Sequence, residues 1–143
     1  MHLIVDGRMA TGDDAPLTTE LEEWLERYPA TIGMTVIAGP VVRADTHMVT
    51  GLVVIAESHI SVHVERMTGV AHVDVFSCKP FDHQVVQATV VRKFRLHDVT
   101  ARAFVRHGDL LADPIGARRA IDAGAERLDP SQNAPVRGML PTP

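Results

Sequence analysis

The segment 56–63, Ala-Glu-Ser-His-Ile-Ser-Val-His, carries two serines and two histidines where a strand would ordinarily supply core side chains. Cys78 follows fifteen residues after His63. Serine hydroxyls, imidazoles and thiols are the groups that enzymes use for nucleophilic and acid–base chemistry. The segment is therefore a candidate reactive surface, although solvent-exposed strands show the same mixture of residues.

The two strands predicted at 58–64 and 70–77 each have one apolar and one polar face, because side chains alternate along a strand. The polar faces carry His59, Ser61, His63, His72, Asp74, Phe76 and Cys78. We expect the apolar faces to pack against helices and the polar faces to line a site. Strict alternation puts Ser58 on the face opposite His63, which predicts a bend or strain near Glu57 and Ser58.

Hydrophobic periodicity predicts the elements that position this segment. We expect strands at 2–6, 33–43, 49–56, 58–64, 70–77 and 98–106, and helices at 17–28 and 82–94. The predicted fold class is α/β of the α+β type, a two-layer sandwich in which an antiparallel-rich sheet has helices on one face.

Local signals refine these elements. Thr19 and Glu22 have the spacing of a capping box, and Tyr28-Pro29 predicts the end of the first helix. Asp82 is the expected N-cap of the second helix, with Val85, Val86, Thr89, Val90 and Phe94 along its apolar stripe. The strand at 33–43 is expected to bend at Gly39-Pro40.

Length and composition bound the function. The 143 residues suit one domain, expected at 1–107, followed by a tail at 108–143 that we expect to be partly disordered. A net charge of −4 gives no reason to expect nucleic acid as a partner. No apolar run is long enough to cross a membrane and no signal peptide is apparent, so a cytoplasmic location is expected. The single cysteine excludes an internal disulfide.

The segment Glu57–His63 resembles the self-cleavage motif of prokaryotic S-adenosylmethionine decarboxylases, and Val73–Cys78 resembles the strand that follows it in that family. The resemblance extends more loosely from His2 to about His107. It implies a pyruvoyl-dependent decarboxylase that makes its own covalent cofactor, with cleavage between Glu57 and Ser58. The Ser58 hydroxyl would attack the Glu57 carbonyl, and the resulting ester would be eliminated and hydrolysed to leave a pyruvoyl group at position 58.

The resemblance also implies roles for three further residues. His63 is the expected processing base, and Thr50 stands where the family has a hydroxyl residue, usually serine, that supports processing. Cys78 is the expected proton donor to the substrate after an amino-acid-type substrate has formed a Schiff base with the pyruvoyl ketone and lost carbon dioxide. The cleaved chain pairs are expected to form a homo-oligomer, with sites near the subunit interface.

The substrate-binding residues depart from the family pattern. Met67 stands where the family has the glutamate that holds the ribose, and Glu65 is the weaker candidate for that role. No Phe, Tyr or Trp lies between Tyr28 and Phe76 to stack on adenine. S-adenosylmethionine, in spermidine and hence polyamine biosynthesis, is the default substrate by resemblance, and ornithine or arginine is the alternative.

Other interpretations follow from the residues taken singly. Cys78 could be a small buried hydrophobe, and a chain that has lost processing would be a non-catalytic small-molecule-binding or assembly domain. A metal site could use His59, His63, His72, Cys78 and His83. We expect no metal, because the spacing of these residues follows strand alternation rather than a zinc pattern.

Overall fold

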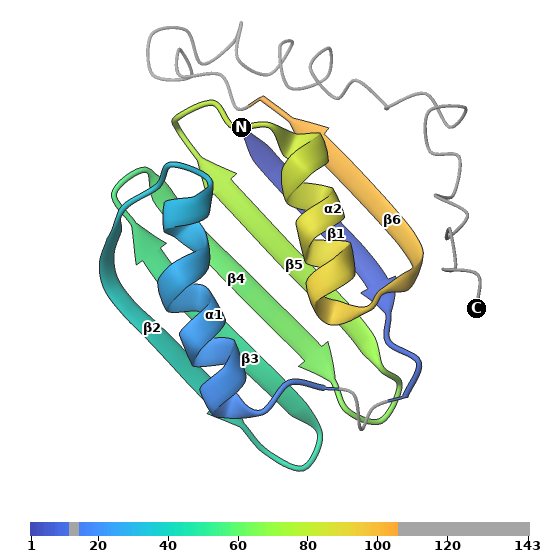
Figure 1. Ribbon diagram of the computed structural model, residues 1–143. Helices are drawn as coiled ribbons and strands as arrows, with labels where there is room; N and C mark the ends of the chain where they lie inside the picture. Colours follow the sequence, from blue (N-terminus) through green and yellow to red (C-terminus); the bar gives the residue numbers. More distant parts are fainter. Residues whose placement is uncertain (12–14, 106–143) are drawn as a thin grey trace, which may run out of the picture.

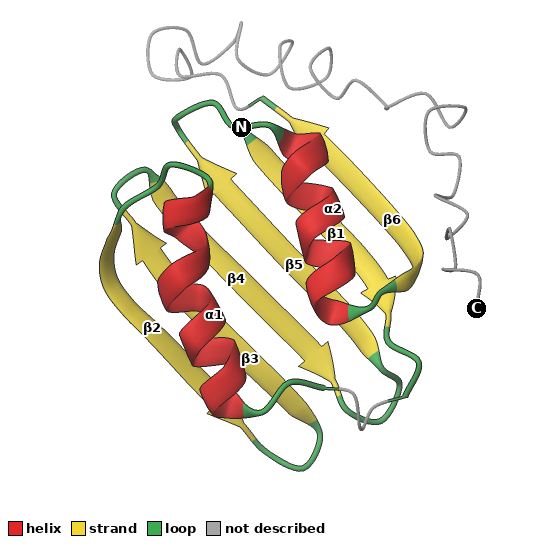
Figure 2. Cartoon of the chain, viewed as in Figure 1, coloured by secondary structure: helices red, strands yellow, loops and turns green. Residues whose placement is uncertain are grey.

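The computed structural model describes residues 1–11 and 15–105, so the predicted tail at 108–143 lies outside the described residues. The described chain forms one sheet with two helices (Figures 1 and 2). Its elements in order are β1 (His2–Arg8), α1 (Thr18–Thr31), β2 (Val36–Ala44), β3 (Met48–Ile55), β4 (Ser58–Glu65), β5 (Val70–Ser77), α2 (His83–Phe94) and β6 (His97–Phe104). No helix among the described residues has the length and apolar character needed to span a bilayer.

The sheet has the order β2-β3-β4-β5-β1-β6, and every neighbouring pair is antiparallel. Tight connections join β2 to β3, β3 to β4 and β4 to β5, whereas β1 lies between β5 and β6 (Figure 1). The predicted α+β class and its antiparallel sheet are confirmed. The candidate segment forms β4, in the interior of the sheet.

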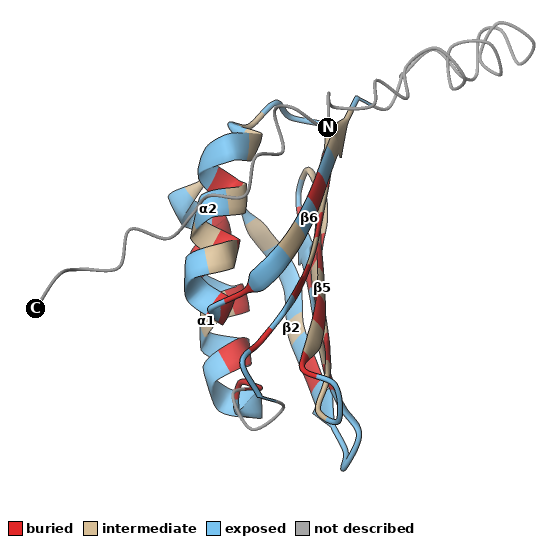
Figure 3. Ribbon diagram, turned by 90° about the vertical axis from the view of Figure 1, so that its right-hand side faces the viewer, coloured by how far each residue is buried: buried red, intermediate tan, exposed pale blue. Residues whose placement is uncertain are grey.

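Both helices lie on the same face of the sheet, and within the described residues the other face carries no second layer (Figure 3). Burial along β4 follows this arrangement. Ile60, Val62 and Val64 face the helices and are fully buried, whereas His59 and His63 are only partly buried on the other face. We call this second surface the open face.

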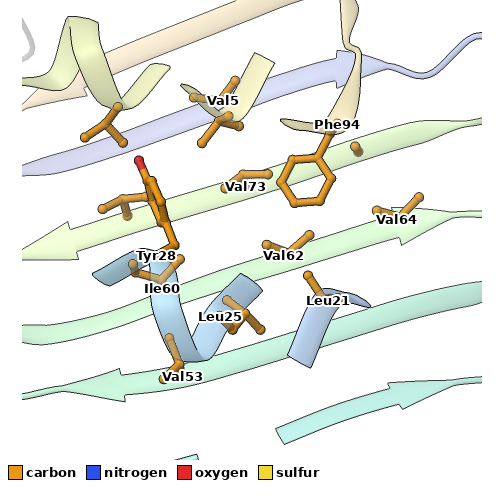
Figure 4. Close-up of a cluster of buried hydrophobic side chains, with 14 of the residues drawn as sticks. Val5, Leu21, Leu25, Tyr28, Val53, Ile60, Val62, Val64, Val73 and Phe94 are labelled. Carbon is orange, nitrogen blue, oxygen red and sulfur yellow. The ribbon is translucent and has the colours of Figure 1, made fainter. Parts of the chain in front are cut away.

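The core lies between the helices and the sheet (Figure 4). Leu21 and Leu25 of α1 are fully buried there with Val53, Ile60 and Val62. Each such side chain contributes about 1.5–3 kcal/mol on burial.

Gly51 marks a close approach between α1 and β3. A Cβ at this position would lie 2.7 Å from Leu25 Cδ1 and 2.9 Å from Leu21 Cδ2, so the helix packs where a larger side chain would clash. The apolar faces therefore fix the sheet against the helices and leave the open face to carry the polar residues.

Two predictions about α1 are wrong. The Leu17 N–H donates to Glu20 Oε2 at 3.2 Å at the start of the helix, in place of the predicted Thr19–Glu22 box. The helix also continues through Pro29 to Thr31. Pro29 is buried in the last turn, where a missing N–H costs only one helix hydrogen bond.

The predictions for α2 and β2 are mostly confirmed. Asp82 accepts hydrogen bonds from the N–H groups of Gln84 and Val85 and caps α2. Val86, Val90 and Phe94 are buried, but Val85 is 56% exposed and Thr89 is only partly buried, so the predicted stripe is too wide. The register of β2 against β3 shifts on both sides of Ala38, which places irregularities around the predicted bend.

Candidate active site

The Glu57 carbonyl at the start of β4 is held by the end of β5. The Cys78 N–H donates to the Glu57 carbonyl oxygen at 3.0 Å, and Ser58 is paired with Ser77 in the sheet. An N–H aimed at a carbonyl oxygen polarises the C=O bond and faces the negative charge that forms when a nucleophile attacks it. The Cys78 N–H therefore lies where negative charge would form if a nucleophile attacked the Glu57–Ser58 peptide bond.

Ser58 departs from regular strand geometry. Its φ of 157° is positive, in a region that L residues rarely adopt, so the expected bend is present at this residue. Its Oγ lies 3.1 Å from Nδ1 of His59, the next residue along the strand. The hydroxyl that would attack the Glu57 carbonyl thus already has an imidazole nitrogen as its partner.

A tight turn presents Cys78. The Ser77 hydroxyl, which is fully buried, donates to the Lys79 carbonyl at 2.8 Å and accepts from the Lys79 N–H at 2.9 Å. Cys78 lies between these two residues and is exposed. The alternative of a small buried hydrophobe is therefore wrong for Cys78, because the turn that orients its N–H also leaves its side chain open to solvent.

A second group of polar residues lies at the other end of β4. Thr50 and His63 are opposite each other in β3 and β4, and Thr50 Oγ1 lies 2.7 Å from His63 Nδ1. The His63 ring stacks on that of His72 in β5, with centroids 6.3 Å apart. His72 Nδ1 in turn lies 2.7 Å from Asp6 Oδ1 in β1. Four strands thus contribute one continuous polar row across the open face.

These two groups do not meet within one chain. Ser58 and His63 are five residues apart on the same strand, which at about 3.3 Å per residue separates their Cα atoms by roughly 16 Å. The structure brings Glu57, Ser58 and Cys78 together at one end of β4, and it brings Thr50 and His63 together at the other. We call these the Ser58 end and the His63 end.

An aromatic row on the open face was missed by sequence reasoning. Its members are His59 (β4), Phe76 (β5), His2 (β1) and Phe104 (β6), which are successive cross-strand partners. Neighbouring rings in the row have centroids 5.7, 5.4 and 4.9 Å apart. No signal in the linear sequence joins these residues, since the pairing of β1 between β5 and β6 creates the row. It lies at the Ser58 end, and its neighbouring rings are inclined to one another by 49° to 66°.

Glu65 and Met67, at the positions considered for ribose binding, lie in different surroundings. Glu65 shares the open face with His63, and its Oε2 accepts a hydrogen bond from the Thr68 hydroxyl at 2.9 Å. Met67 is 79% exposed in the turn after β4. Among the described residues no three His, Cys, Asp or Glu side chains are placed to hold a metal ion, and His83 lies at the start of α2 rather than on the sheet.

A groove of about 650 Å³ lies on the helix side, with Trp24 and Phe94 among the residues that line it. None of the residues of the Ser58 end or the His63 end lines this groove. The reactive groups instead lie along the sheet, so any chemistry they perform takes place there.

The fold is shared with a solved structure. The crystal structure of the adenosylmethionine decarboxylase from Aquifex aeolicus VF5 superposes with a TM-score of 0.59, at 24% identity, over 71% of this chain and 84% of that one. The two-layer α+β fold described above is therefore shared with that structure.

Sequence comparisons then identify the family. The family model for S-adenosylmethionine decarboxylase matches residues 1–107, and the chain belongs to this family. Similar curated proteins are the S-adenosylmethionine decarboxylase proenzymes of Aquifex aeolicus (32% identical over 54% of this chain) and of Synechococcus sp. WH7803 (42% identical over 46%). The matches span 58% and 48% of those proteins, so this chain matches about half the length of its curated relatives.

Proposed function

We propose that this protein is a proenzyme that cleaves itself between Glu57 and Ser58 and then acts as a pyruvoyl-dependent decarboxylase, a carboxy-lyase. The observation that carries the proposal is the Cys78 N–H on the Glu57 carbonyl oxygen, next to a serine in a positive-φ conformation. The family membership of residues 1–107 and the proenzyme names of the curated relatives support it.

The first step is an acyl shift. Ser58 Oγ bonds to the Glu57 carbonyl carbon, the negative charge on the carbonyl oxygen is met by the Cys78 N–H, and the C–N bond then breaks. The product is an ester that joins the Glu57 acyl group to Ser58 Oγ, with a free amine at residue 58. The positive φ of Ser58 favours this step, because it destabilises the intact peptide relative to the shifted form.

The second step removes the Ser58 α-proton. We propose His63 as the base, hydrogen-bonded through Nδ1 to Thr50 so that its ring is oriented. As the proton leaves, the Cβ–Oγ bond breaks and releases the Glu57 carboxylate. Hydrolysis of the remaining dehydroalanine releases ammonia and leaves the pyruvoyl group at position 58.

Because the Ser58 end and the His63 end are about 16 Å apart in one chain, we propose that each complete site uses two copies. The open face supports this assembly, since Leu52, Val54 and Met48 are more than a third exposed there and no second layer covers them among the described residues. Two sheets packed face to face in opposite directions would place His63 of one copy near Ser58 of the other.

The pyruvoyl group would supply an electron-withdrawing carbonyl that accepts the electron pair left by departing carbon dioxide. Residues of this chain fit the remaining tasks. Cys78 is exposed beside residue 58, where its thiol can donate a proton to the substrate α-carbon. A pyruvoyl group formed from Ser58 would therefore arise next to its proton donor.

We propose S-adenosylmethionine as the substrate, which would place the enzyme in spermidine and polyamine synthesis. The aromatic row at the Ser58 end supports a nucleoside, because an aromatic ring such as that of Phe76 or Phe104 can pack against a purine. The exposed Met67 favours the alternative, a smaller cationic substrate such as ornithine or arginine, for which a ribose carboxylate is unnecessary. Carbon dioxide release from each of the three compounds decides between them, and turnover of ornithine or arginine without turnover of S-adenosylmethionine would exclude the nucleoside. A cytoplasmic location stays a prediction.

Intact mass spectrometry of the purified protein beside a Ser58→Ala variant tests the proposal. We expect two fragments that meet at Glu57 and Ser58, the second without a free amino terminus, and a single full-length chain in the variant. A full-length mass in both proteins after prolonged incubation would favour a non-catalytic binding domain.

A further inference from the structure

We propose that His59 is the general base that takes the proton from the Ser58 hydroxyl in the first step of self-cleavage. This inference rests on the proposed function and assigns a residue to the acyl shift. His59 Nδ1 lies 3.1 Å from Ser58 Oγ, within the range in which a base removes a hydroxyl proton. The residue that acts on the hydroxyl is thus distinct from the residue that acts on the α-proton.

The Glu57 carboxylate and the Cys78 N–H, which also lie near the scissile bond, make their contacts away from the Ser58 hydroxyl. The Glu57 carboxylate accepts a contact from the Thr35 N–H at 3.4 Å, on the side of β2. Cys78 contributes its N–H to the Glu57 carbonyl. His63 lies about 16 Å along the strand from Ser58 and is hydrogen-bonded to Thr50. An imidazole already at the hydroxyl needs no movement of the chain to reach it.

The aromatic row holds the His59 ring in this position. Phe76 packs against it edge to face, with centroids 5.7 Å apart and planes at 66°, and Phe76 itself packs on His2. Such contacts restrict rotation of the imidazole without occupying its nitrogens. In the neutral tautomer with the proton on Nε2, the Nδ1 lone pair therefore points at Ser58 Oγ.

The proton transfers balance within the step. Nδ1 accepts the hydroxyl proton as Oγ bonds to the Glu57 carbonyl carbon, which leaves an imidazolium and an oxyanion at the Cys78 N–H. When the C–N bond breaks, the imidazolium returns the proton to the Ser58 nitrogen and the carbonyl re-forms. His59 ends neutral, and the products are the ester and the free amine.

Hydroxylamine distinguishes the two steps, because it cleaves an ester and leaves an amide intact. We expect His59→Ala to remain full-length and resistant to hydroxylamine, with self-cleavage slowed about 10²–10⁴-fold. His63→Ala, which blocks the later step, is expected to accumulate an ester that hydroxylamine cuts between Glu57 and Ser58. His97→Ala is the matched control, since it removes an exposed histidine of β6 whose Nδ1 contacts Asp98, and it should cleave like the unsubstituted chain.

His59→Asn keeps a hydrogen-bonding group near the Nδ1 position but cannot act as a base, so it decides the question if His59→Ala fails to fold. We expect a folded, slow, hydroxylamine-resistant protein. Added imidazole should restore cleavage of a His59→Gly chain, which a purely structural role would not allow. Self-cleavage of His59→Asn at the unsubstituted rate, or its accumulation as an ester, would overturn the inference. If the unsubstituted chain and His97→Ala never cleave, the proposed function itself fails instead.

Discussion

The two ends of β4 are built in different ways. At the Ser58 end the peptide carbonyl is held by a backbone N–H from the next strand, in a positive-φ conformation, with an imidazole at the hydroxyl. At the His63 end the contacts are between side chains, from Thr50 through His63 and His72 to Asp6. In the proposed mechanism, the first end contains the bond that is cleaved. The second contains the proposed base, His63, which lies far from Ser58 of its own chain.

In the proposed mechanism, the two ends of this one strand serve different steps. Alternation along a strand keeps His59 and His63 on one face but separates them by four residues, so the two imidazoles cannot contact the same atoms. A second copy can supply the missing partner for each end. Substitutions at either end should therefore affect different steps of self-cleavage, unless both ends act in the same step.

The largest effect is expected from mixing two inactive chains. Ser58→Ala and His63→Ala should each fail to complete cleavage alone, but co-expression should restore cleavage of the His63→Ala chain, because its Ser58 then meets His63 of the other copy. Up to about half of the chains in the mixture would be cut, as measured by intact mass, if a complete site needs one end from each copy. A mixture of His63→Ala with a chain carrying both substitutions is the control and should stay uncut. Absence of cleavage in isolated mixed oligomers would contradict sharing between copies.

Cys78→Ala should separate self-cleavage from decarboxylation at the Ser58 end. The substitution keeps the backbone N–H on the Glu57 carbonyl, so self-cleavage should continue within about tenfold of the normal rate. Decarboxylation should fall by about 10²-fold or more, because the proton donor is lost. Mass spectrometry and carbon dioxide release from the same sample measure the two rates. Equal loss of both would mean that the thiol also takes part in cleavage.

Thr50→Val should slow only the step that we assign to His63. The change removes the hydroxyl that lies 2.7 Å from His63 Nδ1 and keeps a similar shape, so the second step should slow about tenfold while the acyl shift proceeds. Hydroxylamine-labile ester should therefore accumulate during the reaction. Thr50→Ser is the matched control, and it should retain the normal rate. A Thr50→Val chain that cleaves normally would show that this hydrogen bond does not orient the base.

The smallest effect concerns the helix layer behind both ends. Burial raises the pKa of Tyr28 to about 12, and its hydroxyl has no hydrogen-bond partner among the described residues. Because the unfolded value is near 10, this group favours the folded state fully below about pH 10, and the contribution is lost as the pH rises toward 12. The chain has a single tyrosine, so absorbance at 295 nm follows it directly.

Melting temperatures from pH 9 to 12 complete that test. Tyr28→Phe should melt close to the unsubstituted protein at pH 7 and lose less stability above pH 10. Titration of Tyr28 near pH 10 in the folded protein would contradict the burial argument.

Sequence patterns predicted most of the scaffold because burial here follows simple periods. Val62 and Val64 alternate with polar residues and face the helices as expected, and Asp82 caps α2 through a local interaction. Pro29 misled the prediction because its local signal to end a helix is overridden where the ring is buried at the last turn. Val85 is exposed because α2 buries a narrower stripe than its apolar residues suggested.

The site was only partly predictable. The pairing of Thr50 with His63 follows from strand register, which the sequence signals through alternation. The contact between Cys78 N–H and Glu57 depends on backbone geometry at two strand ends, and the aromatic row depends on where β1 inserts in the sheet. Neither the Cys78–Glu57 contact nor the aromatic row produces a periodic pattern of residue types in the sequence. The position of His59 at the Ser58 hydroxyl likewise arises from the unusual φ of Ser58 rather than from regular strand spacing.

The irregular β2 has a consequence for how copies can associate. It is an outer strand, and the outward row of N–H and C=O groups on such a strand can recruit another sheet and extend into aggregates. Pro40 contributes no N–H to that row, and the register shifts on both sides of Ala38 interrupt its spacing. This edge is therefore a poor template for further strands. Growth of the sheet by strand addition is therefore discouraged at β2, whereas β6, the other outer strand, contains no proline.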